Sequence, residues 1–146
     1  MRIYKVFRRD PKTNELVSAA MNNPDWMLSY KYRKVTVPKD GSFCMGFSTL
    51  ESAREFVIVD MLSLILPYSF YKQAEIWVCE VPYIKECKGI IPVWEPSYKV
   101  LNFWNIFNTG ESINTATIVS PKGTVFVPSV KPLHRIWVYI NTRRSI

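Results

Sequence analysis

The sequence contains none of the short motifs that mark common phosphate-binding or hydrolytic sites. There is no GxxxxGK[ST] or GxGxxG segment to hold a phosphate, and no GxSxG turn to expose a nucleophilic serine. Gly41 and Gly46 flank an apolar stretch and do not form a phosphate-binding loop. The chain therefore lacks the usual signatures of nucleotide hydrolases and serine hydrolases.

Cysteine and histidine are also scarce. The three cysteines, at positions 44, 79 and 87, form no CxxC pair, and His134 has no second imidazole to join it. We therefore predict no metal site. Cys79 lies in an apolar run and is predicted to be a small buried hydrophobe, whereas Cys87 is predicted to be a surface thiol and His134 a surface or structural residue.

Long apolar runs are missing. The most apolar run, residues 56–66, is broken by Asp60 and Ser63 and is shorter than the roughly 18 residues that cross a bilayer. The first residues mix basic and apolar side chains without the longer apolar stretch of a signal peptide. We therefore expect no membrane partner and a cytoplasmic location.

The composition is that of a folded domain. The chain has 146 residues, of which 48% are hydrophobic and 14% aromatic. This length is typical of one domain, so we predict a single unit over residues 1–146. The many rings indicate either an aromatic core or a ring-lined binding groove, and both interpretations stay open here.

Positive charge is concentrated at the two ends of the chain. The net charge of +7 is distributed as +6 over residues 1–39, −3 over residues 40–101 and +4 over residues 102–146. If the ends meet in space, they form one basic surface that attracts a nucleotide, a nucleic acid or an acidic protein. The alternative is that the basic balance only maintains solubility.

Alternating and β-branched runs predict a sheet-rich α+β domain with an antiparallel or mixed sheet. The predicted strands are residues 3–8, 15–20, 27–32, 34–37, 41–47, 75–81, 123–127 and 134–140. One main helix is predicted at about residues 48–66, with Ser48 and Glu51 as its capping box. A short helix at residues 101–107 is a further expectation.

Rings alternate with cations in Tyr30-Lys31-Tyr32-Arg33-Lys34. Such a run suits the stacking of single-stranded bases together with neutralisation of phosphates. It also suits an edge strand whose lysines discourage aggregation.

Residues 41–56 resemble a segment of the ADP-ribosyltransferase folds related to the poly-ADP-ribose polymerases. In that family a strand with a glycine and an aromatic residue leads into a helix, and Phe47 corresponds to the aromatic residue that stacks on nicotinamide. The family's first strand supplies a cofactor contact, for which this chain offers Lys5 or Arg8. The other similar segments are residues 4–8, 76–81 and 122–139.

The resemblance implies NAD or another nucleotide as the ligand, but the catalytic glutamate of the family is missing. The corresponding stretch reads Lys122-Gly123-Thr124. We therefore expect a non-catalytic binding module, similar to the small basic proteins of phages and viruses. An NAD-dependent transferase, and an assembly protein with exposed rings in residues 92–107, are the alternatives.

No catalytic or metal-ligating residue is assigned. The candidate ligand-binding residues are Arg8, Tyr30, Lys31, Tyr32, Arg33, Phe47 and Ser48.

Overall fold

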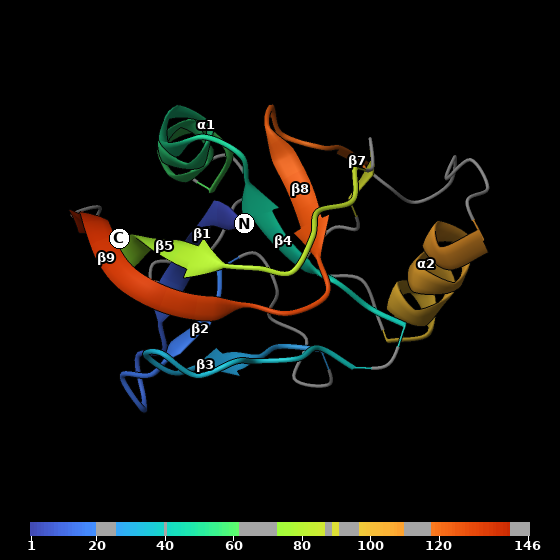
Figure 1. Cartoon of the computed structure of the whole chain (residues 1–146), viewed down its shortest axis with the longest axis horizontal. Coiled ribbons are helices and arrows are strands. Elements are labelled where there is room, and N and C mark those ends of the chain that lie inside the picture. Colours follow the sequence, from blue (N-terminus) through green and yellow to red (C-terminus); the bar gives the residue numbers. More distant parts are fainter. Residues whose placement is uncertain are drawn as a thin grey trace, which may run out of the picture.

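A computed structural model describes residues 1–19, 26–39, 41–61, 73–86, 89–90, 97–109 and 118–140. It is an α+β fold with an open antiparallel sheet and two short helices, as Figure 1 shows. The strands are β1 (Arg2–Arg9), β2 (Leu16–Ser18), β3 (Ser29–Tyr30), β4 (Cys44–Phe47), β5 (Gln73–Glu80), β6 (Gly89–Ile90), β7 (Ile118–Val119), β8 (Thr124–Val127) and β9 (Lys131–Ile140). The helices are α1 (Leu50–Glu55), which continues as a π-helix (Phe56–Met61), and α2 (Ser97–Thr109).

Strand β5 lies between β1 and β9, as its continuous apolar sequence predicts for a central strand. The other edge of β1 is shared, because β4 pairs with its beginning and β2 with its end. Strand β8 continues the sheet beyond β4, and β3 continues it beyond β2. Strands β6 and β7 pair separately. All of these pairs are antiparallel.

Helix α1 covers one face of the sheet. Its buried Ala53, together with Phe56 and Val57 of the following π-helix, packs on Val6 and Ile76. The predicted helix is therefore confirmed to residue 61, and residues 62–66 lie outside the described part. The predicted cap is wrong by one residue: Thr49 is the N-cap and its side chain accepts a hydrogen bond from the backbone N–H of Ser52.

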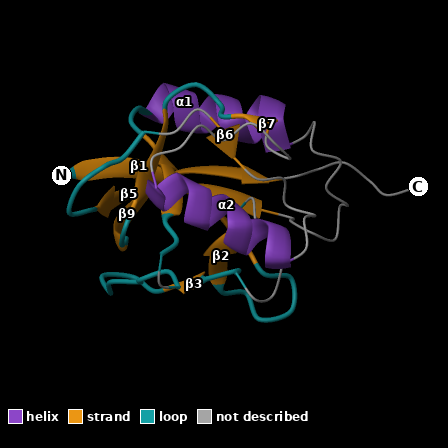
Figure 2. Cartoon of the chain, turned by 90° about the vertical axis from the view of Figure 1, so that its right-hand side faces the viewer, coloured by secondary structure: helices purple, strands orange, loops and turns teal. Residues whose placement is uncertain are grey.

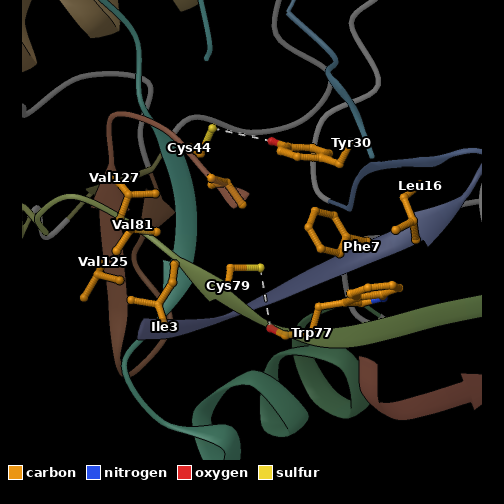
Figure 3. Packing of buried hydrophobic residues seen from close by; sticks show 11 residues of the cluster. Ile3, Phe7, Leu16, Tyr30, Cys44, Trp77, Cys79, Val81, Val125 and Val127 are labelled. Carbon is orange, nitrogen blue, oxygen red and sulfur yellow. Dashed lines mark hydrogen bonds between the residues drawn. The ribbon is translucent and has the colours of Figure 1, made fainter. Parts of the chain in front are cut away.

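The opposite face of the sheet holds a second cluster, drawn in Figure 3. Because side chains alternate along a strand, Ile3 and Phe7 of β1 share this face with Trp77 and Cys79 of β5. Tyr30 packs on Phe7, with ring centroids 4.7 Å apart. The prediction that Cys79 is a buried hydrophobe is confirmed.

Helix α2 lies beside the end of the sheet that β4 and β8 form, and Figure 2 shows it apart from α1. The short predicted helix is thus confirmed and is longer than expected. Its rings Phe103, Trp104 and Phe107 are buried against Phe43 and Phe126. These three rings are therefore not exposed, contrary to what the assembly interpretation assumed. Residues 92–96 lie outside the described part of the chain.

The strand predicted over residues 34–37 is wrong, and the strand predicted over residues 27–32 is confirmed only at Ser29–Tyr30. Residues 34–37 form only an isolated bridge between Thr36 and Val130. Residues 31–34 form a turn closed by a hydrogen bond from Lys34 N–H to the Lys31 carbonyl, because Arg33 adopts a positive φ of 57° that ends the extended chain. The edge-strand interpretation of this basic run therefore holds for Tyr30, in the edge strand β3, and fails for residues 31–34.

Within the residues described, no helix is long and apolar enough to cross a membrane.

The turn before β8 fixes helix α1 through Gly123. Its carbonyl accepts a hydrogen bond from Ser48 N–H, and a Cβ at this position would lie 2.5 Å from Ser52 Oγ. Gly41 has nearly the same φ, +79° against +78°, but an added Cβ there would lie 3.5 Å from Asn108 Nδ2, which is an ordinary van der Waals contact.

We therefore expect Gly41→Ala to lower the free energy of unfolding by about 1–2 kcal/mol from backbone strain alone. Gly123→Ala should cost a further 1–3 kcal/mol or so, because the added methyl also overpacks Ser52. Urea unfolding of both variants measures the difference. Equal losses would show that contact between the turn and α1 is not tight.

Candidate ligand cavity beside Lys5

The two strands that share an edge of β1 diverge in its middle. Tyr4 of β1 lies opposite Phe47 of β4, whereas Phe7 lies opposite Ser18 of β2. Lys5 and Val6 lie between these two pairings. Their edge of β1 is therefore the place where a gap opens in the sheet.

A partly open cavity of about 110 Å³ occupies this place. Residues from the cluster under α1, from the cluster on the opposite face of the sheet and from the ring cluster of α2 all line it, and the lining is predominantly apolar and aromatic. The ring-bearing residues that line it are Trp26, Tyr30, Phe43, Phe47, Phe56, Phe103, Trp104 and Phe126. An engineered apolar cavity of about 150 Å³ holds benzene in another protein, so this smaller space takes at most one ring, with any substituent directed toward its opening.

Lys5 is the cationic group in the lining, and no Asp or Glu of the described residues lines the cavity with it. The residue is 5% exposed, and its Nζ donates a hydrogen bond of 2.6 Å to the Met45 carbonyl. The ammonium also lies 5.3 Å from the centre of the Tyr30 ring. Burial lowers the pKa of Lys5, and negative charge on the Cys44 and Cys79 thiols would oppose that shift.

The polar groups next to Lys5 are neutral at physiological pH. Burial raises the pKa of Tyr30 well above its usual value and also raises the pKa of Cys44. The Tyr30 hydroxyl lies 3.5 Å from Cys44 Sγ, and Figure 3 shows the two side chains pointing toward each other. A protonated Lys5 is therefore a cation without a counter-charge inside an apolar space.

Further groups around the cavity favour an anionic guest. The buried Nε1 of Trp26, whose side chain lines the cavity, has no hydrogen-bond acceptor within the described part of the protein. The Lys39 ammonium lies 4.9 Å from the Trp26 ring centre, and the Lys85 ammonium lies 5.8 Å from that of Phe43. Two cations thus flank lining rings, in addition to Lys5.

The structure separates the residues predicted to form one site. Phe47 and Tyr30 line the cavity. Arg8 is buried three positions along β1 from Lys5, which puts it on the opposite face, with its Nη2 3.0 Å from Met27 Sδ. Ser48 is exposed, and its hydroxyl donates to the Gly123 carbonyl.

The remaining predicted residues, Lys31, Tyr32 and Arg33, are exposed in the turn that follows β3. Of the two cations that the first strand offers, Lys5 lines the cavity together with Phe47, and Arg8 does not. A signal for this was present in the sequence. Lys5 lies two residues from each of the apolar Ile3 and Phe7, so the three side chains share one face of the strand. Two apolar neighbours on that face indicate that it is buried.

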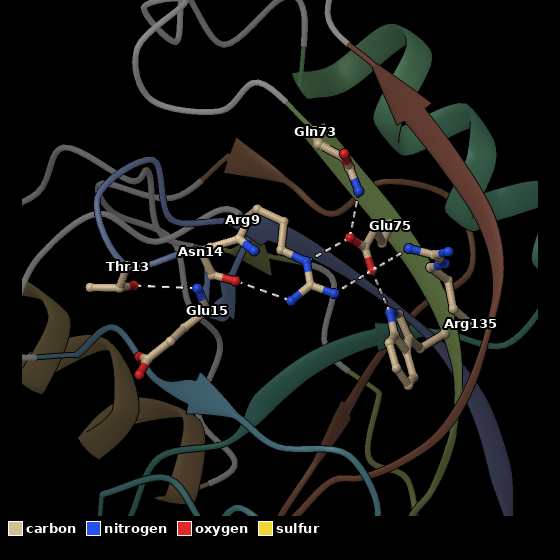
Figure 4. A network of polar contacts seen from close by, with 8 residues as sticks. Arg9, Thr13, Asn14, Glu15, Gln73, Glu75 and Arg135 are labelled. Carbon is tan, nitrogen blue, oxygen red and sulfur yellow. Dashed lines mark hydrogen bonds and ion pairs between the residues drawn. The ribbon is translucent and has the colours of Figure 1, made fainter.

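A second buried polar group is Glu75 of β5, which contacts an arginine from each of the two basic ends of the chain. Glu75 is fully buried and accepts hydrogen bonds from Arg9 Nε at 2.7 Å and from Trp77 Nε1 at 3.0 Å. Arg135 of β9 lies 3.7 Å away, and Figure 4 shows Arg9 and Arg135 approaching the carboxylate from two sides. Strands from both termini thus meet, and part of their charge is neutralised there.

Burial alone would raise the pKa of Glu75. Hydrogen bonds from Arg9, Trp77 and Gln73, with the positive charge of Arg9, reverse this effect and hold the pKa below its usual value. Glu75 is therefore an ionised structural carboxylate.

Comparisons with protein-family models, with curated proteins and with solved structures gave no match. Within the described ranges, no group of three or more His, Cys, Asp and Glu side chains is placed to hold a metal ion. Cys87 falls outside those ranges, so its predicted surface exposure stays a prediction.

Proposed function

We propose that this protein is a non-catalytic binding module that holds a small, planar, negatively charged molecule in the cavity beside Lys5. The observation that carries the proposal is the buried amine of Lys5 in a ring-lined cavity whose described lining contains no carboxylate. Isolated buried charges are costly, and an anionic guest would offset that cost with a charge-assisted hydrogen bond.

The volume and the lining define the ligand further. Space for one ring favours an aromatic carboxylate, or the base of a nucleotide whose phosphates remain outside the cavity. Tyr30 and Phe47 supply faces and edges for the ring, and Lys5 supplies the charge. Nucleic acids and acidic proteins are too large for this cavity, so their binding would need another surface.

The transferase alternative comes from the resemblance to the ADP-ribosyltransferase family, and Phe47, at the position that stacks on nicotinamide in that family, is one of the residues that line the cavity. The turn that should carry the catalytic glutamate contains Lys122 and Gly123 instead. A nicotinamide-sized pocket without that glutamate is consistent with binding and not with transfer. The ADP-ribosyltransferase-like fold and the phage or viral origin stay predictions.

The experiment is a thermal-unfolding titration with matched pairs of ligands. Nicotinate and benzoate should raise Tm, whereas nicotinamide and benzamide should raise it less, because they lack the charge that Lys5 recognises. AMP and NAD test whether a nucleotide enters through its base.

A rise in Tm that is equal for each acid and its amide would contradict the proposal. Transfer of label from NAD to the protein or to an added target would replace it with the enzymatic alternative. Light scattering of the ligand-free protein tests the assembly alternative, which requires a self-associated state.

A further inference from the structure

A second candidate site lies outside the cavity, where the turn at residues 31–34 meets β9. Arg33 N–H donates a 2.8 Å hydrogen bond to the Pro132 carbonyl, and Thr36 exchanges two backbone hydrogen bonds with Val130. These bonds join a basic segment near the N-terminus to a basic strand near the C-terminus. The turn therefore has a fixed position over the sheet.

The turn presents an aromatic ring to solvent. Tyr32 is 57% exposed, although its ring centre lies 6.1 Å from that of Trp77 in an edge-on contact. Arg33 Nε donates a 2.9 Å hydrogen bond to the Tyr32 hydroxyl, and its guanidinium carbon lies 5.3 Å from the ring centre. The ring is thus held in place while much of its surface remains available for stacking.

Positive groups surround this ring. Tyr32 and Trp77 line a groove of about 300 Å³ together with Arg9 and Lys31. Arg135 reaches the same region through its contact with Glu75. Two carboxylates lie nearby. Glu75 is ion-paired with Arg9, whereas Glu15, which lines the groove, accepts a 3.1 Å hydrogen bond from the neutral Ser29 hydroxyl and keeps its charge.

The backbone of Arg33 supports a role for its side chain. Its φ of 57° lies in the left-handed region, which glycine adopts without the steric cost that an arginine bears. Glycine at this position would therefore form the same turn with less backbone strain. The presence of arginine at a strained position points to a use for the guanidinium, which lies on the exposed side of the turn.

We propose that this groove binds single-stranded nucleic acid, with one base stacked on Tyr32 and the neighbouring phosphates held by Lys31, Arg33 and Arg135. Stacking on an aromatic ring accepts any base, and cations along the groove follow the backbone. An acidic protein would use the same cations but would gain nothing from the exposed ring. The inference does not depend on the cavity or its ligand.

The test measures the anisotropy of a fluorescent oligothymidylate of eight nucleotides. Tyr32→Ala should weaken binding by about fivefold to a hundredfold, because the base loses its stacking partner. Tyr32→Phe keeps the ring and should stay within about twofold of the parent protein. Equal losses in the two variants would contradict stacking.

Arg33→Gly tests the phosphate contact and keeps the backbone turn, but it also removes the hydrogen bond from Arg33 Nε to the Tyr32 hydroxyl. Tyr32→Phe removes the same hydrogen bond and keeps Arg33, so it controls for that loss. Arg33→Gly should weaken binding and reduce the slope of log affinity against log salt concentration by about 0.7, the value for one contact on a single strand. Lys122→Ala is the matched control, since it removes one exposed charge from the turn beside α1. If Lys122→Ala weakened oligonucleotide binding as much as Arg33→Gly, the affinity would depend only on net charge, and the proposed site would be wrong.

Two more measurements complete the test. Polyglutamate that binds as tightly as the oligonucleotide, and with the same affinity to Tyr32→Ala, would assign the surface to an acidic partner and refute the proposal. Lys5→Met should leave oligonucleotide affinity unchanged, because Lys5 does not line the groove, although Tyr30 lines both spaces. A loss in that variant would refute the independence of the two sites.

Discussion

Replacing Glu75 with glutamine should lower the free energy of unfolding by about 3–5 kcal/mol at neutral pH. The substitution preserves the shape of the side chain but removes the charge that faces Arg9 in a fully buried position. It also leaves an amide where Trp77 Nε1 and Gln73 Nε2 now donate to carboxylate oxygens. Urea unfolding at pH 7 measures the loss.

The control is Arg135→Gln. The Arg135 side chain is 47% exposed and lies 3.7 Å from Glu75, so its removal should change stability by less than about 1 kcal/mol. Two equally destabilised variants would show that the carboxylate depends on the whole cluster of cations and not on Arg9.

The pH dependence of stability provides an independent check. Because the pKa of folded Glu75 is depressed, its contribution is present above the unfolded pKa of about 4.3 and is lost as pH falls through the folded pKa. The stability difference between the parent protein and Glu75→Gln should therefore narrow under acidic conditions. A difference that is constant from pH 7 to pH 2.5 would contradict this account.

Replacing Lys5 with methionine should weaken the binding of an aromatic acid by about tenfold to a hundredfold. The variant loses one charge-assisted hydrogen bond inside an apolar cavity, which contributes about 1.5–3 kcal/mol. Binding of the neutral amide should change little, because methionine preserves most of the volume and the ring contacts. Calorimetric titration of both ligands into both proteins measures these effects.

The same substitution should raise the stability of the ligand-free protein by about 1–2 kcal/mol at pH 7, because it removes an isolated buried charge. The alternative is that Lys5 is structural and satisfies the Met45 carbonyl where β1 and β4 diverge. In that case methionine would lower the stability by about 1–3 kcal/mol. Lower stability with unchanged ligand affinity would overturn the proposed function.

The pH dependence again has a defined sign. Folding lowers the pKa of Lys5. Above the unfolded pKa of about 10.4 the side chain is neutral in both states, and burying it carries no charge penalty. As pH falls through the folded pKa, the buried amine becomes protonated and the folded state loses that stability. The stability advantage of Lys5→Met should therefore shrink as the pH rises. Affinity for the anionic ligand should fall over the same range, because the amine loses its proton.

Local patterns were sufficient for most elements of the fold. The alternation of β1, the apolar run of β5 and the helical spacing of Ala53 and Val57 each predicted the observed structure, because neighbouring residues determine these periodicities. The helix cap moved from Ser48 to Thr49, since both residues are good caps and only the approach of Gly123 distinguishes them. The prediction of an extended chain at residues 31–34 was wrong, because an alternating pattern of side chains does not reveal the positive φ of Arg33.

The candidate sites depended on contacts between distant segments. By itself the sequence determined the basic termini and the abundance of rings, whereas the burial of Lys5 came from the structure. Only the tertiary structure decided that β1 divides its edge between β2 and β4, which opens the cavity next to Lys5. It also placed Tyr30 between the two candidate sites: Tyr30 lines both the cavity and the groove, whereas Tyr32, two residues along the chain, lines the groove and not the cavity.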